Sequence, residues 1–287
     1  MFPSTFTTAD NLKLKCSLRS TSDDPAALLI IVHGLGEHSE SLPYSLFEPF
    51  LTERRYAVLK FDLRGHGRSE GPRGHVNSWR DFRNDLKIFV ELARRKFKGK
   101  PLFLLGASLG GLIVLDHALN VEEKPAGLVL VAPALSADGA SWIVRYSVPI
   151  LSQILPKVSI DPRLDLRNIS RDRQLATEYS SDPLFSTRLS MRLAGETLNA
   201  VSATLADAAA IDLPILILHG DADKIVPTSS SEHLYAKVSS GVKRRIVYSG
   251  AFHNLLLETD RERVYSDIIG WIDNQLPNRN RSHPVER

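Results

Sequence analysis

The sequence has almost no cysteine and no long apolar run, and each absence excludes a class of protein. Cys16 is the only cysteine among 287 residues, so an internal disulfide and a multi-cysteine zinc site are both excluded. We expect Cys16 to be a small buried side chain on an early strand rather than a reactive thiol. No apolar run approaches the roughly 18 residues of a membrane-spanning helix, and the N-terminus lacks the pattern of a secretory signal. The expected location is therefore the cytoplasm.

An excess of charge of one sign is also lacking. The chain carries 36 basic and 33 acidic residues, a formal net charge of +3, spread along the sequence. This balance is weak evidence for a polyanionic partner, so we do not expect nucleic-acid binding. What the chain does have is 43% hydrophobic residues, enough to bury a large core as one domain, with or without an insertion. Nothing in these numbers indicates an oligomeric state.

Short apolar runs predict a buried parallel sheet. They are rich in Leu, Ile and Val without strict alternation, as is typical of parallel strands covered on both faces. They occupy residues 26–32, 56–61, 101–105, 127–131, 213–218 and 245–248. Helical patterns lie between them, notably at residues 79–97 and 261–276. This alternation predicts a doubly wound α/β fold, with a mostly parallel sheet and helices on both faces.

One segment interrupts the alternation. From residue 136 to residue 206 there is no convincing strand, but there are apolar helical stretches such as SWIVRYSVPILSQILP. We predict that residues 136–206 form a helical cap inserted over one end of the sheet. Residues 1–135 and 207–287 would then form the α/β core.

The stretch FLLGASLGG at residues 103–111 predicts a nucleophile. A serine at the tip of a sharp strand-to-helix turn needs glycine two residues before it and two after it, because a Cβ at either position would collide with nearby backbone. Gly106 and Gly110 occupy these places around Ser108. A strand pattern precedes the motif and a helical pattern follows it, so the helix N-terminus directs its positive dipole at the site. We therefore predict that Ser108 is a nucleophile.

A serine hydroxyl needs a base, and His253 is the best placed of the nine histidines. In α/β folds with a serine at such a strand-to-helix turn, the chain order is Ser, then Asp or Glu, then His. The histidine must therefore lie in the C-terminal part of the chain. His219 ends a predicted strand and is interpreted as structural, His233 lies in a helical pattern, and His283 lies in a polar tail. His253 follows the last predicted strand, in a loop from which its imidazole can reach the serine.

The carboxylate that orients the histidine should follow the strand at residues 213–218. The sequence HGDADKIVP offers Asp221 and Asp223 at this place. Asp221 is expected to form the turn by bonding its own backbone, whereas Asp223 lies beyond the tightest part of the turn. We favour Asp223 as the orienting carboxylate.

Acyl transfer also needs donors for the developing oxyanion, and the backbone N–H groups of Leu35 and Leu109 are the candidates. Leu109 follows the serine, and the glycines of the loop IVHGLGEHSE let Leu35 approach it. Glu37 and His38 in this loop are open to interpretation as a metal or acid-base pair. No third ligand is in view, so hydrogen bonds that shape the loop are favoured, and no metal site is expected.

Six motifs taken together resemble one protein family. They are, in chain order, HGLGEHSE, FDLRGHGRSEG, GASLGG, ISRD with YSSDPL, HGDADKIVP and GAFHNLLLE, and they extend from about residue 34 to about residue 258. The chain resembles the monoacylglycerol lipase group of α/β hydrolases, also labelled serine-aminopeptidase-like or lysophospholipase-like. The resemblance implies an α/β-hydrolase fold, no cofactor, and a mobile, membrane-facing cap over a long acyl tunnel. It also implies site roles for Ser108, Asp223, His253, Leu35, Leu109 and Tyr179.

Three positions depart from the usual pattern of this group. Ala107 stands before the nucleophile where histidine is common, and Ser41 stands where the HGxGEHSxR motif usually has arginine. Leu175 replaces the glutamate that mammalian-type members place four residues before the tyrosine matching Tyr179. In the group, these side chains help to hold the polar glycerol end of the substrate.

The expected function is hydrolysis of lipid-like carboxylic esters, above all monoacylglycerols, by a Ser-His-Asp acyl-enzyme mechanism. The apolar cap, with Ile143 and Ile150 among its residues, is expected to bind acyl chains and to touch a membrane surface transiently. The alternatives are a lysophospholipase, a short-chain carboxylesterase or a peptidase with the same triad. A non-catalytic lipid receptor on the same fold is a further alternative.

Overall fold

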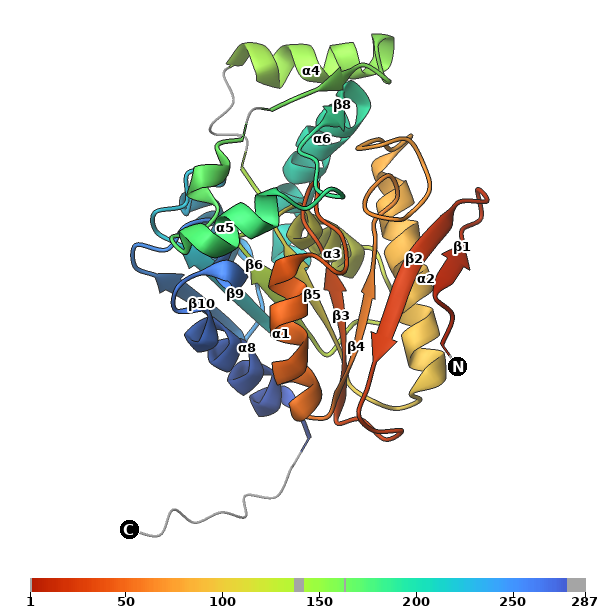
Figure 1. Ribbon diagram of the computed structural model, residues 1–287, viewed down its shortest axis with the longest axis vertical. Helices are drawn as coiled ribbons and strands as arrows, with labels where there is room; N and C mark the ends of the chain where they lie inside the picture. Colours follow the sequence, from red (N-terminus) through yellow and green to blue (C-terminus); the bar gives the residue numbers. More distant parts are fainter. Residues whose placement is uncertain (1, 137–141, 163, 278–287) are drawn as a thin grey trace.

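The computed structural model describes residues 2–136, 142–162 and 164–277, and for residues 142–146 it describes the backbone alone. Its centre is an eight-stranded sheet (Figure 1). The strands are, in order across the sheet, β1 (Thr5–Thr7), β2 (Lys13–Arg19), β4 (Tyr56–Phe61), β3 (Ala27–Val32), β5 (Leu102–Ala107), β6 (Gly127–Val131), β9 (Ile215–Gly220) and β10 (Lys243–Tyr248).

All strand pairs from β4 to β10 are parallel, whereas β2 is antiparallel to β4 and β1 is antiparallel to β2. The predicted α/β fold with a mostly parallel sheet is confirmed. The six predicted strands agree with the observed ones to within two residues at each end. The antiparallel strands β1 and β2 lay outside the apolar runs because their buried and exposed residues alternate.

Helices cover both faces of the sheet. Alternate side chains of β3 point to opposite sides, so Leu28 and Ile30 belong to one core and Leu29 and Ile31 belong to the other. The first core contains side chains of α2 (Trp79–Lys96), α3 (Leu109–Leu119) and α7 (Ser229–Lys237). The second contains side chains of α1 (Leu42–Glu53) and α8 (Arg261–Gln275). The three-layer arrangement explains why the central parallel strands β3, β5 and β6 are apolar along their whole length.

The helical pattern at residues 79–97 has local signals at both ends. Ser78 and Asp81 form a capping box at the N-terminus of α2, and Arg94, Arg95 and Lys96 occupy its last turn. The cap satisfies backbone N–H groups, and the basic side chains complement the helix dipole. Both ends of this helix are therefore specified by residues next to them in the sequence.

Between β6 and β9 the chain forms a separate group of elements above the sheet (Figure 1). These are α4 (Trp142–Ile154), β7 (Ser159–Ile160), the 3₁₀ helix η1 (Leu166–Asn168), α5 (Arg173–Ser180), β8 (Leu189–Ser190), α6 (Met191–Asp207) and the 3₁₀ helix η2 (Ala208–Ala210). The segment is mainly helical, but β7 and β8 form a short antiparallel pair that the sequence did not predict. Helix α4 packs against α6 and lies farthest from the sheet.

Two further findings concern possible membrane spans and the position of Cys16. In the part of the chain that the structure describes, no helix combines the length and apolar character needed to cross a bilayer. Cys16 is buried on β2, where its Sγ donates to the carbonyl oxygen of Pro3 at 3.3 Å. Burial raises the pKa of this thiol to about 11, so it stays protonated.

Candidate active site

Ser108 lies at a sharp turn where β5 ends and α3 begins. Its backbone has φ 49° and ψ −115°, a conformation that few residues other than glycine adopt. A Cβ at Gly106 would lie 2.4 Å from the carbonyl oxygen of Gly110, and one at Gly110 would lie 2.0 Å from that of Val32. The two glycines of the motif are therefore required by the close approach of backbone, as the sequence predicts.

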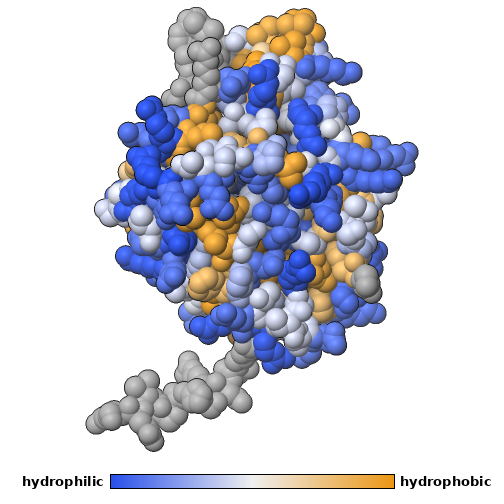
Figure 2. Space-filling model, viewed as in Figure 1, coloured by the Kyte–Doolittle hydropathy of each residue, from blue (hydrophilic) through white to orange (hydrophobic). Residues whose placement is uncertain are grey.

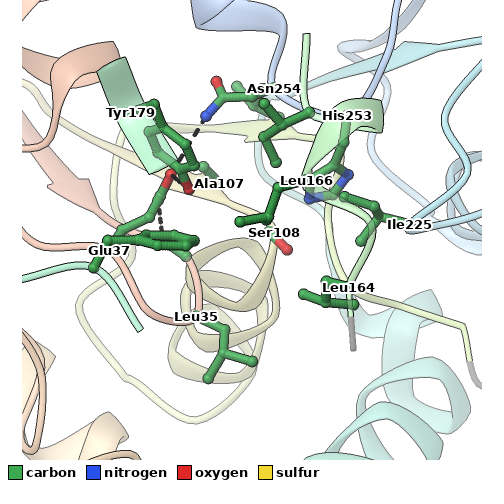
Figure 3. Close-up of a pocket in the computed structure, with 14 residues that line it drawn as sticks. Leu35, Glu37, Ala107, Ser108, Leu164, Leu166, Tyr179, Ile225, His253 and Asn254 are labelled. Carbon is green, nitrogen blue, oxygen red and sulfur yellow. Dashed lines mark hydrogen bonds between the residues drawn. The ribbon is translucent and has the colours of Figure 1, made fainter. Parts of the chain in front are cut away.

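His253 and Asp223 come from the loops after β10 and β9. The Nδ1 atom of His253 lies 2.7 Å from the Oδ2 atom of Asp223. Because an ionised carboxylate only accepts hydrogen bonds, Nδ1 is the donor and Nε2 is left as the basic nitrogen. Ser108 and His253 line the same cavity (Figure 3). The structure thus brings together the three side chains that were predicted to act as a unit.

Asp223 is held as an anion. Burial alone would raise the pKa of its carboxyl group, but this effect is outweighed by the imidazoles of His253 and His219 and by backbone N–H groups. Its Oδ1 atom accepts from the N–H groups of Ile225 at 2.8 Å and Val226 at 3.0 Å. Together these groups hold the pKa of Asp223 well below its usual range.

Asp221 has a different role from Asp223. Its side chain is exposed, and its Oδ1 accepts from the backbone N–H of Gly250 at 2.6 Å. It therefore stabilises a turn, but by linking the loops after β9 and β10 rather than by bonding its own backbone. No contact between Asp221 and His253 occurs among the hydrogen bonds of the described residues.

The loop after β3 lies directly against Ser108. A Cβ at Gly34 would lie 3.3 Å from the Cβ of Ser108, so the glycine permits this approach. Leu35 follows it and lines the cavity, and Leu109 follows Ser108 at the first position of α3. His33 holds the loop from behind, since its Nδ1 donates to the carbonyl of Gly34 at 2.8 Å. The backbone around Leu35 is thus fixed close to the serine.

Glu37 organises this loop as a buried hydrogen-bond acceptor. Its Oε2 accepts from the N–H of Gly34 at 2.7 Å and from the Tyr44 hydroxyl. Its Oε1 accepts from the Tyr179 hydroxyl at 2.8 Å and from the Asn254 amide at 3.3 Å. Four donors offset the cost of burying the charge. These four hydrogen bonds support the loop-shaping role of Glu37. In the described ranges no cluster of three acidic, histidine or cysteine side chains suits a metal ion.

The segment at residues 179–186 is bonded to the same loop. Besides the bond from Tyr179 to Glu37, His38 pairs with Asp182 at 2.8 Å, and the N–H of Ser186 donates to the carbonyl of Gly36 at 3.1 Å. We call this set of contacts the loop–cap junction. The motifs HGLGEH and YSSDPL are therefore in contact, although more than 140 residues separate Glu37 from Tyr179 in the sequence.

A second segment between β6 and β9 is bonded to the loop that carries His253. The N–H of Asn254 donates to the carbonyl of Ile169 at 2.8 Å, and Arg171 pairs with Glu258 at 2.7 Å. Glu258 is fully buried and also accepts from the N–H of Phe252 at 2.7 Å. The position of the imidazole therefore depends on contacts with the ISRD segment as well as on Asp223.

The cavity at Ser108 has an apolar part and a polar end. Its water-accessible volume is about 50 Å³. Figure 3 shows Tyr179, Glu37 and Asn254 grouped on one side of Ser108. The apolar lining is formed by Leu35, Ala107, Val131, Leu164, Leu166, Ile169, Phe185 and Ile225. The resemblance implied a long acyl tunnel, but a cavity of this volume holds only a few water molecules.

The predicted substrate-binding residues lie in different places relative to the cavity. Tyr179 lines the cavity. Ile150 does not line it, since its side chain is 62% exposed on α4, and the side chain of Ile143 lies outside the described residues. Sequence reasoning did not single out Asn254, because nothing but its place after His253 distinguishes it from other polar loop residues.

A family model described as serine aminopeptidase, S33, matches residues 23–260, which is more than half of the chain. The chain belongs to this family. The human monoglyceride lipase is 31% identical over 272 residues, 92% of this chain and 88% of that protein. A monoacylglycerol lipase of Mycolicibacterium smegmatis is 29% identical over 255 residues, 88% of this chain and 90% of that protein.

Solved structures agree with this assignment. The crystal structure of Paleococcus ferrophilus monoacylglycerol lipase has a TM-score of 0.83 and 29% identity, and covers 91% of this chain and 99% of that one. A soluble variant of Saccharomyces cerevisiae monoglyceride lipase, in complex with a substrate analog, has a TM-score of 0.82 and 28% identity, with coverages of 94% and 93%. This family member is a monoacylglycerol lipase-like α/β hydrolase, and it is a carboxylic ester hydrolase.

The departures from the group pattern are visible in the structure. Ser41 is the residue before α1, is buried, and accepts from the N–H of His38 at 2.9 Å, so it shapes the loop after β3. Leu175 lies on α5 and packs against a small apolar cluster that includes Tyr179. The hydrolase therefore has hydrogen-bonding and packing groups at two positions where charged side chains are usual in the group.

Proposed function

We propose that this hydrolase cleaves monoacylglycerols to fatty acid and glycerol through an acyl-enzyme on Ser108. The observation that carries the proposal is the cavity at Ser108, which joins an apolar lining to a single polar end. A monoacylglycerol has the same division, an aliphatic chain on one side of the ester and hydroxyl groups on the other. The relatives named monoacylglycerol lipase and monoglyceride lipase support the choice of this ester over others.

In the first half of the proposed reaction, Ser108 is acylated. The Oγ atom attacks the ester carbonyl carbon while Nε2 of His253 takes its proton, and the N–H groups of Leu35 and Leu109 bind the oxyanion. The carbonyl then re-forms, the bond to glycerol breaks, and His253 gives its proton to the leaving alcohol. Asp223 holds the imidazole in the tautomer that this requires and stabilises its charged form.

In the second half, water replaces the alcohol. His253 takes a proton from the water as its oxygen attacks the acyl carbon, and the same two N–H groups hold the second oxyanion. The proton then returns to Oγ of Ser108 as the fatty acid leaves. His253 gives back each proton that it receives within the same half-reaction, so this series of reaction steps needs no cofactor.

The polar end is the proposed site for the glycerol group. Glu37 has accepting oxygens at the cavity surface, and Tyr179 and Asn254 present donors that now point at Glu37. Rotation of either side chain lets a glycerol hydroxyl enter this network by exchanging one hydrogen bond for another. The cost of desolvating the hydroxyl groups is thereby offset within the site.

We further propose that residues 136–206 act as a cap over this cavity. Leu164, Leu166 and Phe185 from this segment line the cavity beside Ser108. With about 50 Å³ available, a long acyl chain enters only if some of these side chains are displaced. The acyl chain would then be in contact with the displaced apolar side chains.

A substrate panel tests the proposal directly. Monoacylglycerols of several chain lengths, lysophospholipids, short p-nitrophenyl esters and aminoacyl amides are compared by kcat/KM under one set of conditions. The highest kcat/KM is expected for a monoacylglycerol. A preference for lysophospholipids or acetyl esters would indicate one of the alternative ester hydrolases, and turnover of the amides would indicate a peptidase. Saturable lipid binding without turnover of any ester would indicate a receptor.

The exposed apolar residues of α4 lead to a prediction about lipid surfaces. Ile150 is 62% exposed and Ile154 is 67% exposed, and Figure 2 shows hydrophobic surface at the top of the molecule, where α4 lies in Figure 1. Charging both residues, as Ile150→Glu with Ile154→Glu, should weaken binding to phosphatidylcholine vesicles on the order of tenfold or more. Hydrolysis of long-chain monoacylglycerol in vesicles should fall with it, whereas hydrolysis of a soluble butyryl ester should change little.

The matched control charges two exposed valines on and beside the edge strand β10. Val242 is 47% exposed and Val247 is 41% exposed, and neither is in the cap segment. Val242→Glu with Val247→Glu should leave vesicle binding and both activities close to those of the wild type. A folded α4 variant with unchanged vesicle binding, as judged by co-sedimentation and a thermal melt, would show that α4 does not contact the lipid surface.

A further inference from the structure

His219 contacts the same carboxylate oxygen that orients His253. It lies at the carboxyl end of β9, is completely buried, and its Nε2 is 3.1 Å from Oδ2 of Asp223. The same Nε2 is 3.0 Å from the carbonyl oxygen of Val226. Both partners are acceptors, so Nε2 carries a proton and its N–H is shared between them. Oδ2 of Asp223 thus accepts from two imidazoles, His253 at 2.7 Å and His219 at 3.1 Å.

The other nitrogen of His219 shows which form of the ring is present. Nδ1 is buried and has no hydrogen-bond partner within the described residues. A proton on Nδ1 would place an unpaired donor and a positive charge in the interior, which is costly. The neutral ring with one N–H, on Nε2, fits these surroundings. His219 therefore acts on Asp223 as a fixed neutral donor.

The two oxygens of Asp223 are fixed by different groups. Oδ1 is held by the backbone N–H groups of Ile225 and Val226, and Oδ2 is held by His219 in addition to His253. Without His219, the only donor left on Oδ2 among the described residues would be the imidazole that the carboxylate is meant to orient. Resting on the proposed roles of Asp223 and His253, we propose that His219 is a positioning residue of the triad. It fixes Oδ2 and limits the negative charge that this oxygen presents to His253.

This role has a consequence for pH dependence. An oxygen that already accepts one N–H attracts a second donor less strongly, so loss of the His219 N–H would strengthen the interaction of Asp223 with the charged form of His253. The acidic limb of the kcat/KM profile would then move to higher pH, because the free enzyme would stay protonated up to a higher pH. A histidine that only filled space in the core would not move this limb when replaced.

The other ionisable groups around the triad stay in place in such an experiment. Glu37 and Tyr179 face His253 across the cavity, and Glu258 with Arg171 lies behind the loop that carries it. Lys224 follows Asp223 in the chain and is exposed. Because no variant below alters these residues, a shift of the acidic limb reports on the contact between His219 and Asp223.

The test compares three substitutions by pH profile. His219→Leu and His219→Met remove the donor, and His219→Gln retains a side-chain N–H. With a soluble butyryl ester, the Leu or Met protein should show an acidic limb raised by about half a pH unit or more, and a kcat lowered on the order of tenfold with little change in KM. The Gln protein should show both values close to the wild type. The control is His117→Leu, which removes a buried imidazole from α3 that lines a different hollow.

A spectroscopic readout accompanies the kinetics. The Nδ1 proton of His253 is expected at a more downfield proton NMR position in the variants without the donor, since its bond to Oδ2 strengthens. Either donor-free variant suffices if the other does not fold. If neither folds, a His219→Gln protein whose acidic limb differs from that of the wild type would overturn the inference. Donor-free proteins with reduced thermal stability but an unmoved limb and an unmoved proton would also overturn it. If Asp223→Asn left turnover unchanged, the proposed function itself would fail, and the two failures are thereby distinguished.

Discussion

The Ser108→Ala protein is expected to fold like the wild type and to lose ester turnover on the order of 10⁴-fold or more. The hydroxyl oxygen is the only atom removed, and the backbone of residue 108 is held by contacts that do not involve it. The N–H of Ser108 donates to the carbonyl of Val131 at 2.9 Å, and its carbonyl accepts from the N–H of Ala134 at 3.0 Å. The variant therefore keeps the turn and the oxyanion donors but cannot form the acyl-enzyme.

Covalent labelling separates this result from simple loss of folding. A fluorophosphonate probe should label the wild type and not the Ser108→Ala protein, while the two proteins melt at similar temperatures. Ser249→Ala, which alters a serine in the turn after β10, is a suitable control and should retain labelling and turnover. Labelling that persisted in the Ser108→Ala protein would place the nucleophile at another residue.

Asp223→Asn is expected to lower kcat on the order of 10⁴-fold, whereas Asp221→Asn should cost far less. An amide at position 223 can donate to Nδ1 of His253 and so favours the tautomer whose Nε2 cannot take the serine proton. It also removes the negative charge that stabilises the imidazolium. Asp221 is exposed and accepts from the N–H of Gly250, so its replacement weakens one turn and leaves the histidine in place.

The comparison is made by kcat with a soluble ester and by thermal melting of both variants. Because the pKa of Asp223 lies well below its usual range, its carboxylate stays ionised over the whole range in which the enzyme is expected to work. The acidic limb of the wild-type profile is therefore not expected to report the ionisation of Asp223. If Asp221→Asn caused the larger loss of kcat, the orienting role would move to Asp221.

The parts of the fold that the sequence predicts best are those with a local physical cause. The parallel strands were recognisable because a strand covered on both faces has no polar side, as in β3 and β5. The turn at Ser108 was recognisable because glycine is needed wherever backbone approaches within van der Waals distance, as Gly110 does with Val32. Strands β1 and β2 lacked such a signal, since one side of each meets solvent.

The parts that escaped prediction depend on contacts between distant segments. Asn254 and Tyr179 meet at Glu37 only after α5 packs near the loop after β3, and no spacing in the sequence encodes that meeting. His219 was interpreted as structural because it ends a strand, and its contact with Asp223 arises from the turn that follows. In the cap segment an apolar pattern marks a helix but does not say which side faces water, so Ile150 was expected near substrate and is exposed.

In the function that we propose, the loop–cap junction implies that substrate specificity and catalytic machinery are not separable modules. A chimera whose foreign cap lacks residues matching Tyr179 and Asp182 would remove one of the four donors to Glu37 and the partner of His38, and it could also disturb the backbone bond to Gly36. Glu37 would keep its bonds to Gly34, Tyr44 and Asn254, but the loop that carries Leu35 would lose contacts at successive residues. Engineers who exchange caps to obtain new substrates should therefore transplant residues 34–38 along with the cap, and directed evolution of the cap should yield compensating changes in those five positions.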